Sequence, residues 1–313
     1  MASTDNNTKA KSSAGPAAKR LLDPSVLANL GNLELIARTV VRGVVIGLHK
    51  THDFGFSQEF AEYREYQQGD DPRLIDWNVY ARSERTYIKR FRGETNSQLM
   101  VLLDTSASMG FKSNPKGVSK LDYGKMLAAS LVYLSSKQKD ATGLMLFDDD
   151  VRDFRAPSSR LGQMPSILHL LETTEAANKT QLDKPFQKAM SLNLKRGMVV
   201  VISDFYADPE SLIELVRPMS MAGQDVLFCQ VMDDAELHPD YQDSVLLEDA
   251  ENGAVVEVSP EFMRDEYVQK LAEHNQNVEE SARRAGCDYV LLNSREPLDR
   301  SLHRYLSFRQ RRS

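Results

Sequence analysis

The chain has 313 residues, of which 41% are hydrophobic and 27% charged, a composition typical of a soluble globular protein with a sizeable core. Its formal net charge of −6 at pH 7 argues against a nonspecific nucleic-acid binder. Cys229 and Cys287 fall in apolar stretches and are predicted to be reduced core residues. No segment is typical of a signal peptide or a transmembrane helix, since the best candidate, residues 40–48, is too short and contains Arg42. We therefore expect a cytoplasmic protein with no direct membrane insertion and no nucleic-acid partner.

The N-terminal part of the chain is expected to have two regions. Residues 1–20 lack apolar periodicity and are predicted to be a disordered tail. Residues 21–95 are predicted to pack on the domain that follows them. Within this region, the helical spacing of apolar residues over 24–36 predicts one helix that continues across Gly31. The pattern over 78–91 is typical of a β-hairpin.

Residues 96–296 show short apolar runs that alternate with amphipathic helical segments. The predicted strands are 98–103, 142–147, 151–154, 199–202, 226–231 and 289–292, and the predicted helices are 121–138, 161–171, 182–192, 211–222 and 262–285. This alternation predicts an α/β domain with a doubly wound, mostly parallel sheet and helices on both faces. Residues 297–313 contain several arginines and are predicted to be a basic C-terminal tail.

Polar side chains follow the first predicted strand of this domain. The apolar run over 98–103 ends at Asp104, and Ser106 and Ser108 come at alternate positions after it. Ligands of open α/β sheets bind at the carboxyl ends of the strands. A carboxylate and two hydroxyls are hard oxygen ligands, which suit Mg²⁺, Mn²⁺ or Ca²⁺. The alternative is a polar turn in which a serine caps the next helix.

A second strand and a loop contribute similar side chains. The apolar run that ends at Ile202 is followed by Asp204, and Thr180 lies in a polar loop just before a predicted helix. Two acids at strand ends and a threonine in a loop can converge at one edge of a sheet, which favours a cation site over a simple turn.

These residues carry a family resemblance. Asp104-x-Ser106-x-Ser108, with Thr180 and Asp204, resembles the metal-ion-dependent adhesion site of von Willebrand factor A domains. The segment from Glu59 to Trp77 resembles the signature of the DUF58 family, which carries such an A-type domain and is often associated with MoxR-type AAA+ ATPases. The resemblance extends from about residue 40 to the last strand.

The resemblance implies a von Willebrand factor A-like, Rossmann-type fold and a set of metal ligands. Asp104, Ser106 and Ser108 would form the core of the site, and Thr180 and Asp204 would complete it. Mg²⁺ is the expected ion, with Mn²⁺ or Ca²⁺ as alternatives. The expected partners are a MoxR-type AAA+ ATPase and a client protein that offers a carboxylate to the metal.

The signature segment combines charges of both signs with aromatic residues. Its candidate partner-docking residues are Arg64, Asp70, Asp71, Arg73, Asp76 and Trp77. The alternative is an internal network in which arginines pair with carboxylates and fasten the segment to the sheet. Further along the chain, the acidic run 148–150 is predicted to be a solvated hairpin turn.

Three functions remain open at this point. The first is a non-catalytic, metal-dependent protein-interaction module that acts with a MoxR-type ATPase in protein assembly, maturation or chaperone-like work. The second is a Mg²⁺-dependent phosphohydrolase with Asp104 as nucleophile, although Ser106 stands where such phosphatases commonly have a second aspartate. The third is a structural scaffold that needs no metal.

Overall fold

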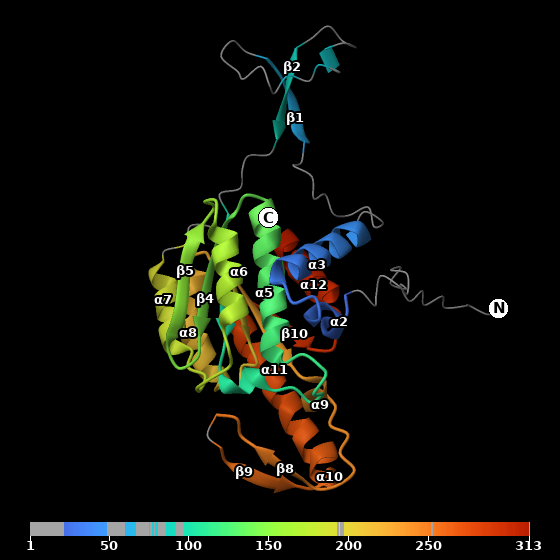
Figure 1. The fold of residues 1–313 in the computed structure, drawn as a ribbon. Coiled ribbons are helices and arrows are strands. Elements are labelled where there is room, and N and C mark those ends of the chain that lie inside the picture. The colour runs from blue at the N-terminus through green and yellow to red at the C-terminus, as the bar shows by residue number, and fades with distance from the viewer. Residues whose placement is uncertain are drawn as a thin grey trace, which may run out of the picture.

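A six-stranded sheet forms the centre of the protein, with its strands in the order β10, β7, β6, β3, β4 and β5 (Figure 1). The computed structural model describes residues 22–48, 60–66, 75, 77, 79–80, 86–91, 97–192, 194, 197–251 and 253–312. The strands are β3 (Gln98–Asp104), β4 (Ala141–Phe147), β5 (Val151–Ser158), β6 (Gly197–Ser203), β7 (Asp225–Met232) and β10 (Asp288–Asn293). Every neighbouring pair is parallel except β4 with the edge strand β5.

Helices cover both faces of this sheet, so the predicted fold class is confirmed. The helices that follow β3 are η2 (Ala107–Gly110), α5 (Lys120–Lys137), α6 (Gln163–Thr173), α7 (Asp183–Ser191), α8 (Pro209–Met221), α9 (Asp234–Leu237), α10 (Pro260–Phe262), η3 (Met263–Tyr267), α11 (Val268–Arg284) and α12 (Leu298–Arg312). Each strand and helix predicted within 96–296 overlaps one of these elements. Among the described residues, no helix combines the length and the hydropathy that crossing a membrane requires.

The central strand β3 shows why the sheet is buried on both faces. Leu99, Val101 and Leu103 pack into the core layer beneath α3, α5, α6 and α12. Met100 and Leu102 point to the opposite layer, beneath α7, α8 and α11. Successive side chains of a strand alternate between faces, so an unbroken apolar run is the expected sequence of a strand covered on both sides. Cys229 and Cys287 are buried cysteines outside any disulfide, as predicted.

The N-terminal segment forms two helices, and the prediction of one helix over 24–36 was wrong. The first, α2 (Pro24–Ala28), is separated from α3 (Leu33–Leu48) by Gly31, whose φ of +62° lies in the left-handed region that glycine adopts readily. α3 then packs against α5 and α12, with Val40 fully buried. Residues 1–20 lie outside the described residues.

The pattern over 78–91 does not form the predicted hairpin. Its second half is β2 (Tyr87–Phe91), which pairs antiparallel with β1 (Phe60–Glu65), and residues 79–80 are helical. The strand partner therefore comes from the signature segment rather than from the adjacent residues. This two-stranded ribbon is a separate sheet and stands apart from the central sheet in Figure 1.

The C-terminal residues also differ from the prediction of a basic tail over 297–313. Residues 298–312 form α12, and its first turns belong to the core because Leu298, Leu302, Tyr305 and Leu306 are buried. These apolar residues recur at three- and four-residue spacing, which places them on one helix face. The prediction of a tail rested on the arginines of this segment and not on its apolar spacing.

Leu302→Ala is expected to destabilise the protein by about 2–5 kcal/mol, because Leu302 is fully buried and its loss leaves a cavity. Arg300→Ala is the matched control, since its side chain is 55% exposed. Urea unfolding of the wild type and both variants gives the free energies of unfolding. Equal effects of the two substitutions would show that α12 does not belong to the core.

Candidate functional site

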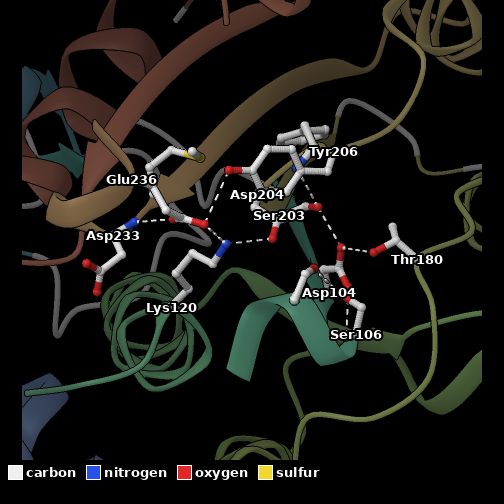
Figure 2. Close-up of polar contacts among 12 residues, drawn as sticks. Asp104, Ser106, Lys120, Thr180, Ser203, Asp204, Tyr206, Asp233 and Glu236 are labelled. Carbon is white, nitrogen blue, oxygen red and sulfur yellow. Dashed lines mark hydrogen bonds and ion pairs between the residues drawn. The ribbon is translucent and has the colours of Figure 1, made fainter. Parts of the chain in front are cut away.

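Two buried carboxylates mark the carboxyl ends of neighbouring parallel strands. Asp104 is the last residue of β3, and Asp204 follows the last residue of β6. Both residues have no exposed surface. The pairing of β3 with β6 brings these ends together at one edge of the sheet, as the sequence predicted (Figure 2).

Asp104 is held by three hydrogen bonds. Its Oδ1 accepts from the Ser106 backbone N–H at 2.9 Å. Its Oδ2 accepts from Ser203 Oγ at 2.6 Å and from Thr180 Oγ1 at 3.3 Å. Ser106 Oγ lies 3.1 Å from Ser108 Oγ, at the start of η2. The structure therefore brings Asp104, Ser106, Ser108 and Thr180 together and adds Ser203, which the sequence analysis did not single out.

The loop that carries Thr180 is fastened by Asp148. The Asp148 carboxylate accepts from Asn178 Nδ2 at 2.9 Å, and its backbone carbonyl accepts from the Gln181 N–H at 2.8 Å. Asp148 is only 1% exposed, so the prediction of a solvated acidic turn was wrong for this residue. Asp149 and Asp150, the rest of the run, are exposed. A buried acid at the end of β4 thus positions a neighbouring loop of the site.

Thr180 also contacts a carboxylate from a distant part of the chain. Glu251 Oε1 accepts from the Thr180 N–H at 3.2 Å and lies 3.1 Å from Thr180 Oγ1. Glu251 follows β8 (Val245–Glu248), which forms a hairpin with β9 (Val255–Val258). Neither the hairpin nor this contact was predicted.

A buried lysine neutralises Asp204. Lys120 Nζ lies 2.9 Å from Asp204 Oδ2 and 2.8 Å from Glu236 Oε1, and the lysine side chain is 1% exposed. Ser119 and Asp122 form a capping box that starts α5 at Lys120 and so places this side chain at the site. Since lysines are rarely buried, the sequence offered no direct signal for this pair.

The turn after Asp204 has a backbone conformation that only a few non-glycine residues adopt. Phe205 has φ of +53°. Its N–H donates to Ser203 Oγ at 3.0 Å, and its carbonyl lies 3.0 Å from His274 Nε2. The Phe205 ring stacks on Phe228 with 4.7 Å between centroids. These contacts hold the left-handed turn that sets the position of Asp204.

Burial and like charge shift the protonation of the site. Burial, together with the nearby charge of Asp204, raises the pKa of Asp104 from its ordinary 3.8 to about 7. The pKa of Lys120 is raised, because the charges of Asp204 and Glu236 outweigh the burial that would lower it. Burial also raises the pKa of Glu236, against the opposing effect of Lys120.

The donor set fits a hard divalent cation. Asp104, Asp204 and the hydroxyls of Ser106, Ser108 and Thr180 supply only oxygen atoms. Asp204 Oδ1 is buried and has no hydrogen-bond partner among the described residues, which leaves it free to accept a water or a cation. The described part of the chain holds no group of three or more His, Cys, Asp or Glu side chains that could bind a metal, so hydroxyls would have to supply part of this coordination.

The predicted docking residues are largely outside the described part of the chain. Arg64 lies in β1, whereas Asp70, Asp71, Arg73 and Asp76 fall outside the described residues. Trp77 is 62% exposed and meets Tyr80 edge to face at 6.0 Å.

The fold and the acid–hydroxyl cluster define a doubly wound α/β domain whose candidate site lies where β3 and β6 end. A comparison of the sequence with models of known protein families identifies one family. The model of the family described as "Protein of unknown function DUF58" matches residues 62–277, and the chain belongs to the DUF58 family, which confirms the prediction.

Curated relatives support this membership. An uncharacterized protein of Mycobacterium tuberculosis strain H37Rv, Rv1480, is 31% identical over 287 residues, which span 88% of this chain and 87% of the relative. An uncharacterized protein of Mycobacterium bovis, Mb1516, matches with the same identity and the same coverage.

Solved structures with a similar chain course include BatB from Bacteroides thetaiotaomicron, with 17% identity and a TM-score of 0.47 over 67% of this chain and 96% of that one. An aerotolerance-related membrane protein from Bacteroides fragilis has 18% identity and a TM-score of 0.45 over 66% and 96%. The SpRpn10 VWA domain has 13% identity and a TM-score of 0.38 over 66% and 94%.

Asp104→Asn is expected to stabilise the metal-free protein at alkaline pH. The pKa of Asp104 is about 7 in the folded protein and near its ordinary 3.8 in the unfolded chain. Binding of a proton therefore stabilises the folded state at low pH, and this stabilisation is lost as the pH rises to about 7. Asparagine stays neutral, so its advantage over the wild type should grow by roughly 1–3 kcal/mol between about pH 5 and about pH 8.

Urea unfolding in chelator across this pH range measures the difference. The exposed neighbour variant Asp149→Asn is the control and should follow the wild type. An Asp104→Asn advantage that does not change with pH would contradict a raised pKa.

Lys120→Met is expected to destabilise the protein by about 3–5 kcal/mol, because it leaves two carboxylates without their buried counter-charge. Lys184→Met is the matched control, since Lys184 pairs with Asp150 at 2.7 Å on an exposed surface. The second substitution Asp204→Asn should recover part of the loss in the Lys120→Met background. Urea midpoints test this order, and additive effects of the two substitutions would refute the pairing.

Proposed function

We propose that this protein is a non-catalytic, metal-dependent protein-interaction module. A divalent cation, Mg²⁺ by preference and Mn²⁺ or Ca²⁺ as alternatives, would be held by Asp104, Ser106, Ser108, Thr180 and Asp204. The observation that carries this proposal is the convergence of two buried acids and three hydroxyls where β3 and β6 end.

The charge balance of the site supports a divalent ion. Asp104, Asp204 and Glu236 provide three carboxylates, and Lys120 provides one ammonium. When all are ionised, two negative charges stay uncompensated in a largely buried environment, which is unfavourable. A proton on Asp104 relieves part of this charge, and a divalent cation would relieve all of it.

A cation in such a site can bind a partner directly. Neutral hydroxyl ligands leave the ion with net positive character, and hard cations of this kind take six or more oxygen ligands, some of them from outside the chain. A carboxylate of a client protein would complete the coordination. The contact would be directional and would disappear on chelation.

The arrangement offers little for catalysis. In the phosphohydrolase alternative Asp104 attacks the substrate and a second acid two residues later transfers a proton, but that position is Ser106. Asp104 is also fully buried and accepts three hydrogen bonds, which restrain it as a nucleophile.

Work together with a MoxR-type AAA+ ATPase, in assembly, maturation or chaperone-like remodelling of a client, is part of the proposal. Its support is the resemblance of the signature segment and the family membership. The purified ATPase of the same organism should hydrolyse ATP at a different rate when this protein is added.

Mg²⁺ titration calorimetry on metal-stripped protein tests the site. The wild type is expected to bind at one site, and Asp104→Ala should lose the binding because it removes the central carboxylate. Asp149→Ala, which removes a nearby exposed acid, should bind like the wild type.

Absence of Mg²⁺, Mn²⁺ and Ca²⁺ binding by the wild type would favour the metal-free scaffold. Release of phosphate from a generic phosphomonoester, abolished in Asp104→Ala, would favour the phosphohydrolase instead.

A further inference from the structure

The hairpin β8–β9 brings a carboxylate of the chain itself to the candidate cation site. Glu251 lies in the turn that joins β8 to β9, and its carboxylate accepts from the Thr180 N–H at 3.2 Å. Thr180 Oγ1 lies between two acids, 3.1 Å from Glu251 Oε1 and 3.3 Å from Asp104 Oδ2. Glu251 is half-buried in this position.

The carboxylates of Glu251 and Asp104 both lie within hydrogen-bonding distance of the single hydroxyl group of Thr180. A threonine hydroxyl has one hydrogen, so it donates to Glu251 or to Asp104 but not to both. Asp204 Oδ1, fully buried close by, has no hydrogen-bond partner among the described residues. Two carboxylates thus share the one hydroxyl proton of Thr180, and Asp204 Oδ1 at the end of the neighbouring strand β6 has no donor among the described residues, a shortage that a cation would resolve.

The hairpin itself is weakly attached to the rest of the protein. Leu246, Val255 and Val256 are 55–70% exposed, and β8 and β9 form a separate two-stranded sheet. In Figure 1 the hairpin lies below the central sheet, beside α10. Isolated two-stranded hairpins are marginally stable, so contacts such as that of Glu251 have a large influence on where this one sits.

We propose that Glu251 is a cation ligand supplied by the chain itself, and that the hairpin β8–β9 covers the site until a partner's carboxylate displaces it. Glu251 then occupies the coordination position that a client would use. This inference rests on the proposed function, since it requires a divalent cation at Asp104 and Thr180.

Mg²⁺ titration of three full-length variants tests the ligand role. Glu251→Gln keeps an oxygen that accepts from Thr180 and removes only the charge, so it should weaken Mg²⁺ binding by about 10-fold or more. Glu257→Gln removes an exposed charge from the same hairpin and should bind Mg²⁺ like the wild type. Asp104→Ala marks complete loss of the site.

Amide hydrogen exchange of residues 245–248 and 255–258 tests the closure of the hairpin. In the wild type and in Glu257→Gln, Mg²⁺ should slow exchange in both strands, because the cation ties Glu251 to the site. In Glu251→Gln, saturating Mg²⁺ should leave their exchange unchanged.

The outcomes separate this inference from the proposed function. If the wild type binds Mg²⁺ and Glu251→Gln binds it equally well, the inference fails while the metal site stands. The inference also fails if Glu251→Gln binds Mg²⁺ more weakly but Mg²⁺ does not slow exchange of the hairpin amides in the wild type. In that case the charge of Glu251 acts on the cation from a distance and Glu251 is not a ligand. A wild type that binds no cation overturns both.

Discussion

The buried contact between Lys120 and Asp204 is the constraint on which the site depends. Parallel pairing of β3 with β6 forces Asp104 and Asp204 into one water-poor edge of the sheet, where two negative charges repel each other. The lysine at the start of α5 offsets one of them and also binds Glu236 of α9. Burial, together with the charge of Asp204, raises the pKa of Asp104. A fold with this edge therefore needs a proton or a cation there.

Much of the sheet could be predicted because each buried strand is an unbroken apolar run. The same rule gave Asp104 and Asp204, since an acid that ends such a run lies at the edge of the sheet. The rule failed where a residue's environment depends on distant segments. Lys120 and Asp148 belong to residue types that are usually exposed, and only tertiary packing buries them. Glu251 reaches Thr180 across 71 positions of sequence, which no local pattern reveals.

The predictions for the helices near both ends of the sequence were wrong for a different reason. Apolar spacing continued across Gly31, but the backbone there adopts a left-handed turn and two helices result. In α12 the arginines favoured an exposed tail, but Leu298 and Leu302 lie on a buried helix face. The matched family region, 62–277, includes neither α3 nor α12, although both pack on α5 in the main core. The structural unit is therefore wider than the family model.

The packing of α3 on α12 has a consequence for how the protein is made. The ribosome produces α3 long before α12, yet the two helices cover the same face of the sheet together with α5. Until α12 emerges, Val40 of α3 and the apolar residues of α5 lack part of their final surroundings. Such contacts between distant ends of a chain slow folding and expose apolar surface during synthesis. The nascent chain therefore exposes this apolar surface until α12 has been translated.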